Sequence, residues 1–336
     1  MVTGMDLEHG NAGTIDRPTG ADSSGVLDDA FDRMGATDFE LPNGFVNHGP
    51  MACEALAALG CADRVADWAR WFEQMVGEGP RPVEPARVSD FEGLDALGDY
   101  GRLPEWIGHF DRAVALEGWE KVVALWVPRL VPAMATVLFH GVIRTGHAVR
   151  AIETIETGPR QAELARALGY WAARFRPGRS VSPSSSVTAA SSSETGDLSS
   201  VTGARGAVIA AAADGARHYV VTPTIFNLHG VTGAMAVALL VDHLDPEDAS
   251  AARAQLQAEH AALYYGGRDG GATPGAADGW NPALAPEAAD GWDPALAPEA
   301  ADSRDAHQVK LVEACRRGWE ASGDGAFAAA ARRVSE

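Results

Sequence analysis

The sequence has little positive charge and little cysteine. Of its 336 residues, 27 are Lys or Arg and 46 are Asp or Glu, so the formal net charge at pH 7 is −19. Because such a surface repels phosphate groups, neither a nucleic-acid partner nor an anionic membrane surface is expected. The three cysteines (Cys53, Cys61 and Cys315) form no CxxC pair. This excludes a disulfide framework or a CxxC zinc site and is typical of a reducing compartment.

Long apolar runs are also missing. No stretch of about 18 uncharged apolar residues occurs, so no membrane span is expected. The first 25 residues are polar and acidic, without the apolar core of a secretory signal. The sequence therefore predicts a soluble cytoplasmic protein that needs no membrane partner; a homo-oligomer is compatible with it.

Several common motifs are absent as well. The chain has no GxGxxG after a strand, no GxxxxGK[ST], no HExxH and no GxSxG, so dinucleotide, P-loop, zincin and hydrolase sites are not indicated. Polar and apolar residues hardly alternate, and only Tyr219-Val220-Val221 is predicted as a short strand. Apolar residues instead recur at helical spacing in segments such as 63–76, 160–175 and 246–265. The prediction is a mainly α protein, with ten or more helices in a single large domain.

Composition divides the chain further. Residues 1–25 are predicted to be a flexible tail and residues 26–336 the helical domain, with a flexible Ser-rich insertion at 177–203. A 12-residue repeat fills much of a second predicted loop at 271–303, where the sequence of 276–287 returns almost unchanged at 288–299. Two copies are too few for a solenoid, so we interpret the repeat as a loop duplication.

A polar stripe marks the segment 139–150. At about 100° per residue, His140, Arg144 and His147 fall within about 60° of one another on one helical face. The rest of this helix is apolar nearly all round, which predicts a buried helix. Buried imidazole and guanidinium groups need partners, so the stripe indicates either hydrogen-bonded core residues or a functional site.

Other histidines favour a site. Five of them have a small or apolar neighbour, namely His48, His140, His147, His229 and His307. Three of these precede glycine, which leaves room for another backbone or a ligand beside the imidazole. Imidazole is the usual protein ligand of iron, zinc and copper and a general base near neutral pH.

The spacing of these residues leaves two questions open. His140 and His147 are two turns apart, about 10.5 Å along a helix, so we expect one to bind a metal and the other to face the substrate. His307 and Lys310 are neighbours on one helical face. A solvated Lys310 is the simpler interpretation, but a buried one has a lowered pKa and its neutral amine can bind a metal or react with CO2 to give a carbamate.

Five blocks of this sequence resemble the questin oxidase family. They are NHGPMACEAL (47–56), HGVIRTGHAVR (140–150), ELARALGYWA (163–172), LHGVT (228–232) and HQVKL (307–311). The resemblance covers roughly residues 40 to 320 apart from the two insertions. It implies an oxygenase of anthraquinone-like aromatic polyketides, with oxidative ring opening by C–C cleavage or Baeyer–Villiger-like oxygen insertion.

The same resemblance implies a site. A mononuclear iron, Fe(II), would be held by histidines and a carboxylated lysine, here His48, His140 or His147, His229, His307 and Lys310. We predict His147 and Arg144 as catalytic residues and Arg150 and Asn47 as substrate contacts, with the arginines stabilising anionic oxygens. O2 is the expected co-substrate.

Two other functions stay open at this point. A cofactor-free oxygenase would use a histidine to deprotonate a hydroquinone-like substrate, whose anion would then reduce O2. A helical protein that only binds an aromatic metabolite would consume no O2.

Overall fold

The computed structural model describes residues 23–177, 200–265 and 291–335. Within these ranges the chain forms fourteen α-helices, three short 3-10 helices and no strand, which confirms the predicted mainly α fold. The α-helices are α1 (Ser23–Gly35), α2 (Gly49–Ala58), α3 (Ala62–Glu73), α4 (Val88–Glu92), α5 (Leu103–Glu117), α6 (Trp119–Leu130), α7 (His140–Thr154), α8 (Gly158–Ala173), α9 (Val201–Val221), α10 (Ile225–Leu240), α11 (Pro246–Tyr265), α12 (Leu296–Asp302), α13 (Ala306–Ser322) and α14 (Gly325–Ser335). The 3-10 helices are η1 (Tyr100–Arg102), η2 (Val131–Ala133) and η3 (Val241–His243).

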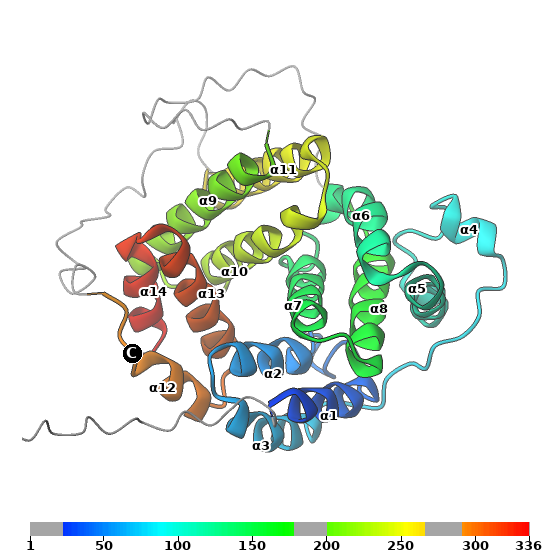
Figure 1. Cartoon of the computed structure of the whole chain (residues 1–336), viewed down its shortest axis with the longest axis horizontal. Coiled ribbons are helices and arrows are strands. Elements are labelled where there is room, and N and C mark those ends of the chain that lie inside the picture. Colours follow the sequence, from blue (N-terminus) through cyan, green and yellow to red (C-terminus); the bar gives the residue numbers. More distant parts are fainter. Residues whose placement is uncertain (1–22, 178–199, 266–290, 336) are drawn as a thin grey trace, which may run out of the picture.

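Four helices form the centre of the molecule. Helices α2, α7, α10 and α13 pack in a closed ring, α2 on α7, α7 on α10, α10 on α13 and α13 on α2. The other helices surround this ring: α8 covers α7, α9 covers α10, α14 and α12 cover α13, and α1 and α3 cover α2 (Figure 1). Because the central helices touch other helices on several sides, they are buried nearly all round, as predicted for 139–150.

Local sequence signals place the ends of these helices. Pro50 in α2 and Pro159 in α8 lie in the first turn, where a missing N–H costs nothing. The Thr224 side chain caps α10 and the Asp305 side chain caps α13. Gly323 ends α13 in the left-handed conformation that glycine adopts without strain.

Some predicted elements differ from the structure. Tyr219-Val220-Val221 is not a strand but the last turn of α9, because the alanine-rich helix before it continues through these residues. Helix α12 lies inside the range 271–303 that was predicted as a loop, since Leu296 and Ala300 are buried against the core. Helix α1 begins within the predicted tail, and α9 begins within the Ser-rich insertion. The rest of both segments, and the first repeat copy, lie outside the described residues.

One described segment is long and apolar enough to cross a membrane. It runs from Ile225 to His243, and 72% of its most apolar window is buried inside the protein. Since α10 packs against α7, α9 and α13, its apolar character is that of a central core helix.

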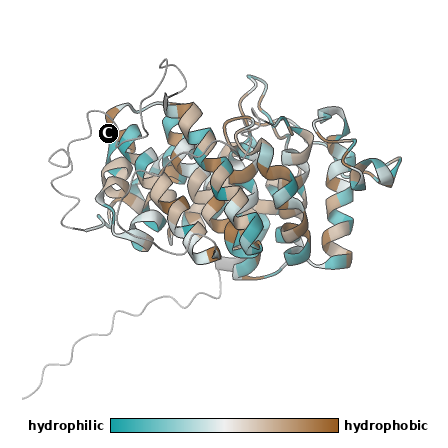
Figure 2. Ribbon diagram, turned by 90° about the horizontal axis from the view of Figure 1, so that it is seen from above, coloured by the Kyte–Doolittle hydropathy of each residue, from teal (hydrophilic) through white to brown (hydrophobic). Residues whose placement is uncertain are grey.

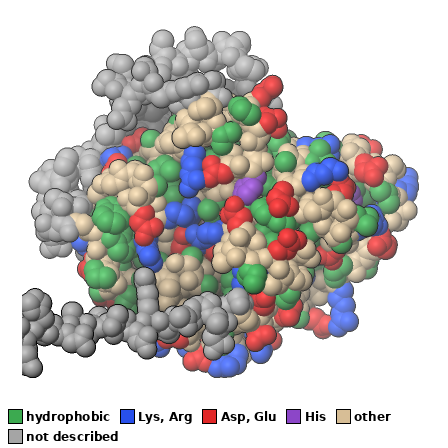
Figure 3. Space-filling view, in the orientation of Figure 1, with side chains coloured by type: hydrophobic (Ala, Val, Ile, Leu, Met, Phe, Trp, Pro, Cys, Tyr) green, Lys and Arg blue, Asp and Glu red, His purple; other side chains and the backbone are tan. Residues whose placement is uncertain are grey.

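Polar residues cover the outside of the helices. The ribbon coloured by hydropathy shows hydrophilic residues on outward turns (Figure 2). On the face drawn in Figure 3, acidic and basic side chains are interspersed with scattered apolar ones. This distribution is ordinary for a helical protein surface.

Candidate metal centre

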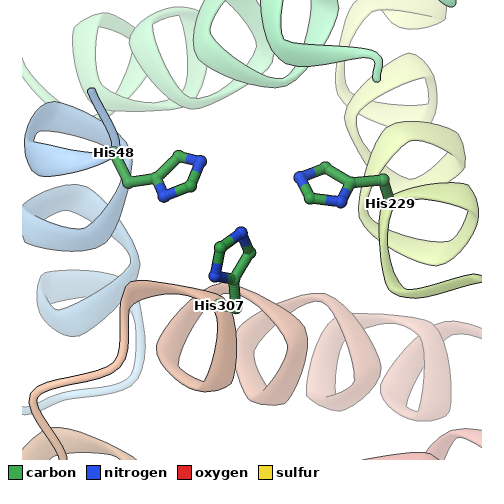
Figure 4. Close-up of side chains that lie close together, drawn as sticks. All are labelled: His48, His229 and His307. Carbon is green, nitrogen blue, oxygen red and sulfur yellow. The ribbon is translucent and has the colours of Figure 1, made fainter. Parts of the chain in front are cut away.

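Four histidines, one from each central helix, converge in the core. His140 Nε2 lies 2.6 Å from His48 Nε2 and 3.1 Å from His229 Nε2. One ring nitrogen from each of His48, His229 and His307 lies within 4.8 Å of the other two, and the three rings point toward one another (Figure 4). We call His48, His140, His229 and His307 the histidine cluster.

Each member of the cluster lies near the beginning of its helix. His48 is the N-cap residue of α2, His140 is the first residue of α7, and His307 is the second residue of α13. His229 lies one turn into α10. The N-terminal end of a helix carries partial positive charge, so four such ends disfavour protonated side chains at the cluster and favour anions.

Backbone carbonyls set the tautomer of two of these imidazoles. His140 Nδ1 lies 2.5 Å from the Val137 carbonyl oxygen, and His229 Nδ1 lies 2.7 Å from the Ile225 carbonyl oxygen. A carbonyl only accepts, so both Nδ1 atoms carry the proton and donate it. Both Nε2 atoms therefore present lone pairs to each other across 3.1 Å, an arrangement that a bound cation would stabilise.

Burial keeps these imidazoles neutral. Desolvation, and secondly the nearby Lys310 amine, hold the pKa of His48, His140 and His229 well below its usual value. The pKa of His307 is also lowered by burial, although the Asp305 carboxylate opposes this. Neutral imidazole is the form that binds metals.

A left-handed turn supplies the carbonyl beside His140. Val137, Leu138 and Phe139 have φ values of 51°, 52° and 63°, a region that non-glycine residues rarely occupy. Such residues cost on the order of 1–2 kcal/mol each, and runs of them concentrate at functional sites. The strained turn places the Val137 carbonyl where it orients the His140 ring.

Lys310 lies beside the cluster and is completely buried. Its side chain is 0% exposed, and Nζ has no hydrogen-bond partner among the described residues. Burial lowers the pKa of Lys310 to about 7, and only Asp305 counteracts this. The amine is close enough to influence the pKa of all four imidazoles. The simpler sequence interpretation, a solvated helix lysine, is therefore wrong.

This donor set fits a transition metal. Nitrogens bound to one ion at about 2.0–2.1 Å lie roughly 3–4 Å apart, close to the spacing within the cluster. Imidazole suits iron, zinc, copper and nickel, and a buried amine without a partner gives a further ligand position. The structure thus brings Lys310 next to the histidine cluster, whose four members are the other predicted ligands.

The three polar residues of the predicted stripe on α7 each have a different partner. His140 belongs to the cluster, whereas Arg144 forms a bidentate ion pair with Glu163 of α8, at 2.7 and 2.8 Å. His147 Nδ1 lies 2.5 Å from Glu54 Oε2 in α2. Of the two candidate ligands in this helix, the structure therefore brings His140, not His147, to the other histidines. Arg144 and His147, predicted as catalytic, are held in buried pairs.

Arg150 and Asn47, the predicted substrate contacts, are also engaged within the protein. Arg150 forms ion pairs with Glu54 and Glu313. The Asn47 amide nitrogen donates to Thr37 Oγ1 and to the Asp38 carbonyl oxygen, while its side-chain oxygen accepts from the N–H of Gly49. Asn47 thus anchors the start of α2 beside His48.

Three charged residues of this region were missed from the sequence. Glu54, Glu313 and Arg317 join His147 and Arg150 in a network of buried and partly buried side chains, which we call the charge layer. Arg317 pairs with Glu313 and donates to the Met235 carbonyl oxygen at 2.6 Å. The only available signal was that Glu54 and Glu313 are acidic residues in otherwise apolar helical faces, and this does not identify their partners.

The glycines that follow histidines have a packing role. A methyl group added at Gly141 would overlap the Trp171 side chain, and one added at Gly230 would overlap the Tyr264 side chain. The space beside these glycines, which was predicted to admit a backbone or a ligand, is instead filled by side chains of surrounding helices.

A cavity of about 370 Å³ lies away from the histidines. It is lined by Pro82, Val83, Glu84, Gly108, Asp111 and Arg112. Glu84 and Arg112 form an ion pair there, and burial raises the pKa of Asp111. These residues present no cluster of metal ligands or activated nucleophile.

Comparison with known proteins found no matching protein-family model and no similar curated sequence.

Proposed function

We propose that this protein is a metal-dependent oxygenase, with iron as the metal and a polycyclic phenol or quinone of the aromatic polyketide type as substrate. One observation supports the metal centre above all: the unprotonated Nε2 atoms of His140 and His229 face each other, and the nearby Lys310 amine has no hydrogen-bond partner among the described residues. The resemblance of blocks 47–56, 140–150, 228–232 and 307–311 to questin oxidases supports the oxygenase chemistry, because these blocks contain all five proposed ligands.

In this proposal Lys310 binds as a carbamate. With a pKa of about 7, a substantial share of the amine is neutral at physiological pH and its nitrogen can attack CO2. The N–C bond forms as one C=O π bond of CO2 opens and its electron pair moves to oxygen, and one N–H proton passes to water, which leaves an anionic oxygen donor. The positive ends of four helices and the metal both stabilise this negative charge.

The protein's own groups then hold and shield the centre. The carbonyls of Val137 and Ile225 orient two imidazoles, and Asp305 accepts from the backbone N–H of His307 and lies 3.5 Å from its ring Nδ1. Iron(II) held by these ligands would supply the redox chemistry that O2 activation requires. Burial of His48, His140, His229 and Lys310 limits access of bulk water to the site.

Metal analysis combined with O2 uptake tests the proposal. Freshly purified protein should contain about one iron per chain, and O2 consumption with hydroxyanthraquinones should stop after iron removal and return on adding Fe(II). Full O2 uptake in iron-free protein with chelator present would contradict the metal role and favour a cofactor-free oxygenase. Tight aromatic binding without O2 consumption would instead favour a binding protein.

A further inference from the structure

A second polar layer lies deeper in the ring of central helices. Members of this charge layer follow the cluster histidines along three of the four helices: Glu54 is six residues after His48, His147 is seven after His140, and Glu313 is six after His307. At 1.5 Å per residue, these are steps of about 9–10.5 Å along each helix. Glu54, His147 and Glu313 thus lie nearly two turns beyond the histidine cluster on the same helices, and Arg150 and Arg317 lie about one turn further.

The contacts of the charge layer connect all four ligand-bearing helices. Glu54 of α2 accepts from Arg150 Nε of α7 at 2.7 Å and contacts His147 of the same helix. Arg150 also pairs with Glu313 of α13. Arg317 of α13 then reaches the Met235 carbonyl of α10. The chain of contacts therefore runs α2–α7–α13–α10.

The charges within this layer balance. Two carboxylates face two guanidinium groups, and the side chains of Glu54 and Glu313 are only 4% and 5% exposed. Burial alone would raise the pKa of Glu313, but Arg150 and Arg317 hold it well below its usual value. Likewise Arg150 and the His147 hydrogen bond outweigh burial and lower the pKa of Glu54. Removing Glu313 would take one ion pair from each of Arg150 and Arg317, and removing Arg317 would leave Glu313 with Arg150 alone.

We propose that the charge layer positions the metal ligands, with Glu313 as the central positioning residue. Each imidazole sits at the start of a helix, so a small tilt of any helix moves its ligand nitrogen relative to the other three. Because Glu313 binds arginines from α7 and α13, and Arg317 extends the connection to α10, it restrains three of the four helices at once. The inference rests on the proposed function only in requiring a metal at the histidine cluster.

Cobalt(II) is a suitable probe, since its visible spectrum reports the ligand set. We would measure the Co(II) dissociation constant by competition with a chromophoric chelator for wild type, Glu313→Gln and Arg317→Gln. Both variants should retain helical circular dichroism and bind Co(II) about 10–100-fold more weakly, with an altered visible spectrum. Arg317→Gln is the milder change because Arg317 is partly exposed, so it keeps the test valid if Glu313→Gln does not fold.

Glu163→Gln is the matched control. It breaks another buried, bidentate Arg–Glu pair, Arg144–Glu163, but this pair joins α7 to α8, and α8 bears no ligand. The control should lose thermal stability while its Co(II) affinity and spectrum stay at wild-type values. Unchanged affinity in Arg317→Gln and in folded Glu313→Gln, or an equal loss in Glu163→Gln, would overturn the positioning role alone. No Co(II) binding by wild type would overturn the metal centre as well, whereas absent oxygenase activity would leave this inference standing.

Discussion

Replacing Lys310 by methionine should stabilise the metal-free protein at neutral pH, although it removes a proposed ligand. Methionine fills a similar volume without a charged group, whereas the lysine amine is fully buried and has no hydrogen-bond partner in the described part of the chain. The pKa of Lys310 is about 7 in the folded protein and 10.5 in the reference state. Below pH 7 both states carry the proton, and folding then includes the full cost of burying the charge, about 5 kcal/mol for a pKa difference of this size.

The pH dependence gives the sign of this effect. Between pH 7 and 10.5 the unfolded chain binds the proton at Lys310 and the folded protein releases it, so wild-type stability rises with pH across this window. The advantage of Lys310→Met should therefore shrink by about 2–3 kcal/mol between pH 7 and pH 9. Urea unfolding of both proteins with chelator present, followed by circular dichroism at several pH values, measures the difference. A stability difference that does not change with pH would refute the buried, unpaired amine.

The remaining predictions concern the histidines. His229→Ala and His307→Ala should each abolish metal binding and turnover with far-UV circular dichroism intact, and retained activity in both would contradict the ligand assignment. His147→Gln should keep most of its metal, measured by elemental analysis, because His147 contacts Glu54 and not the cluster; a greater metal loss than in Glu313→Gln would make it a ligand. The chelator-treated protein should lose stability from pH 6.5 down to about 4, since burial lowers the pKa of His109 and His260 to about 4 while the unfolded chain binds protons near 6.5. Each such histidine contributes up to about 1.4 kcal/mol per pH unit, measurable by urea titration at several pH values, and constant stability over this range would contradict neutral buried imidazoles.

Helical periodicity was sufficient to predict most of the fold. The segment 246–265 is helical over its whole predicted length, and Gly158-Pro159 marks the boundary between α7 and α8. Short helices were harder to predict, because packing against the rest of the protein decides whether they form. Helix α12 begins within the second copy of the Ala- and Pro-rich repeat, whose composition predicts a loop. Burial of Leu296 in the core stabilises the helix, and the sequence does not show this contact.

The histidines and the lysine that meet at the candidate site were predictable from the sequence, and their surroundings less so. Histidine–glycine pairs and the His307–Lys310 spacing identified residues that the structure brings together. The sequence could not separate His140 from His147, since the choice depends on Glu54, 93 positions away along the chain. Nor could it show the left-handed turn before His140, because valine, leucine and phenylalanine do not favour positive φ.

The order of the ligands along the chain has a consequence for biosynthesis. His48, His140 and His229 are made first, but a ribosome must translate more than 300 residues before His307 and Lys310 exist. Glu313 and Arg317 are synthesised later still, and they connect α13 to α7 and α10. A nascent chain that ends after α11 therefore has three of the four histidines but lacks the helix that closes the central ring. Metal loading at the proposed centre should consequently follow the synthesis of α13, and truncation within α13 should leave a protein that binds no metal there.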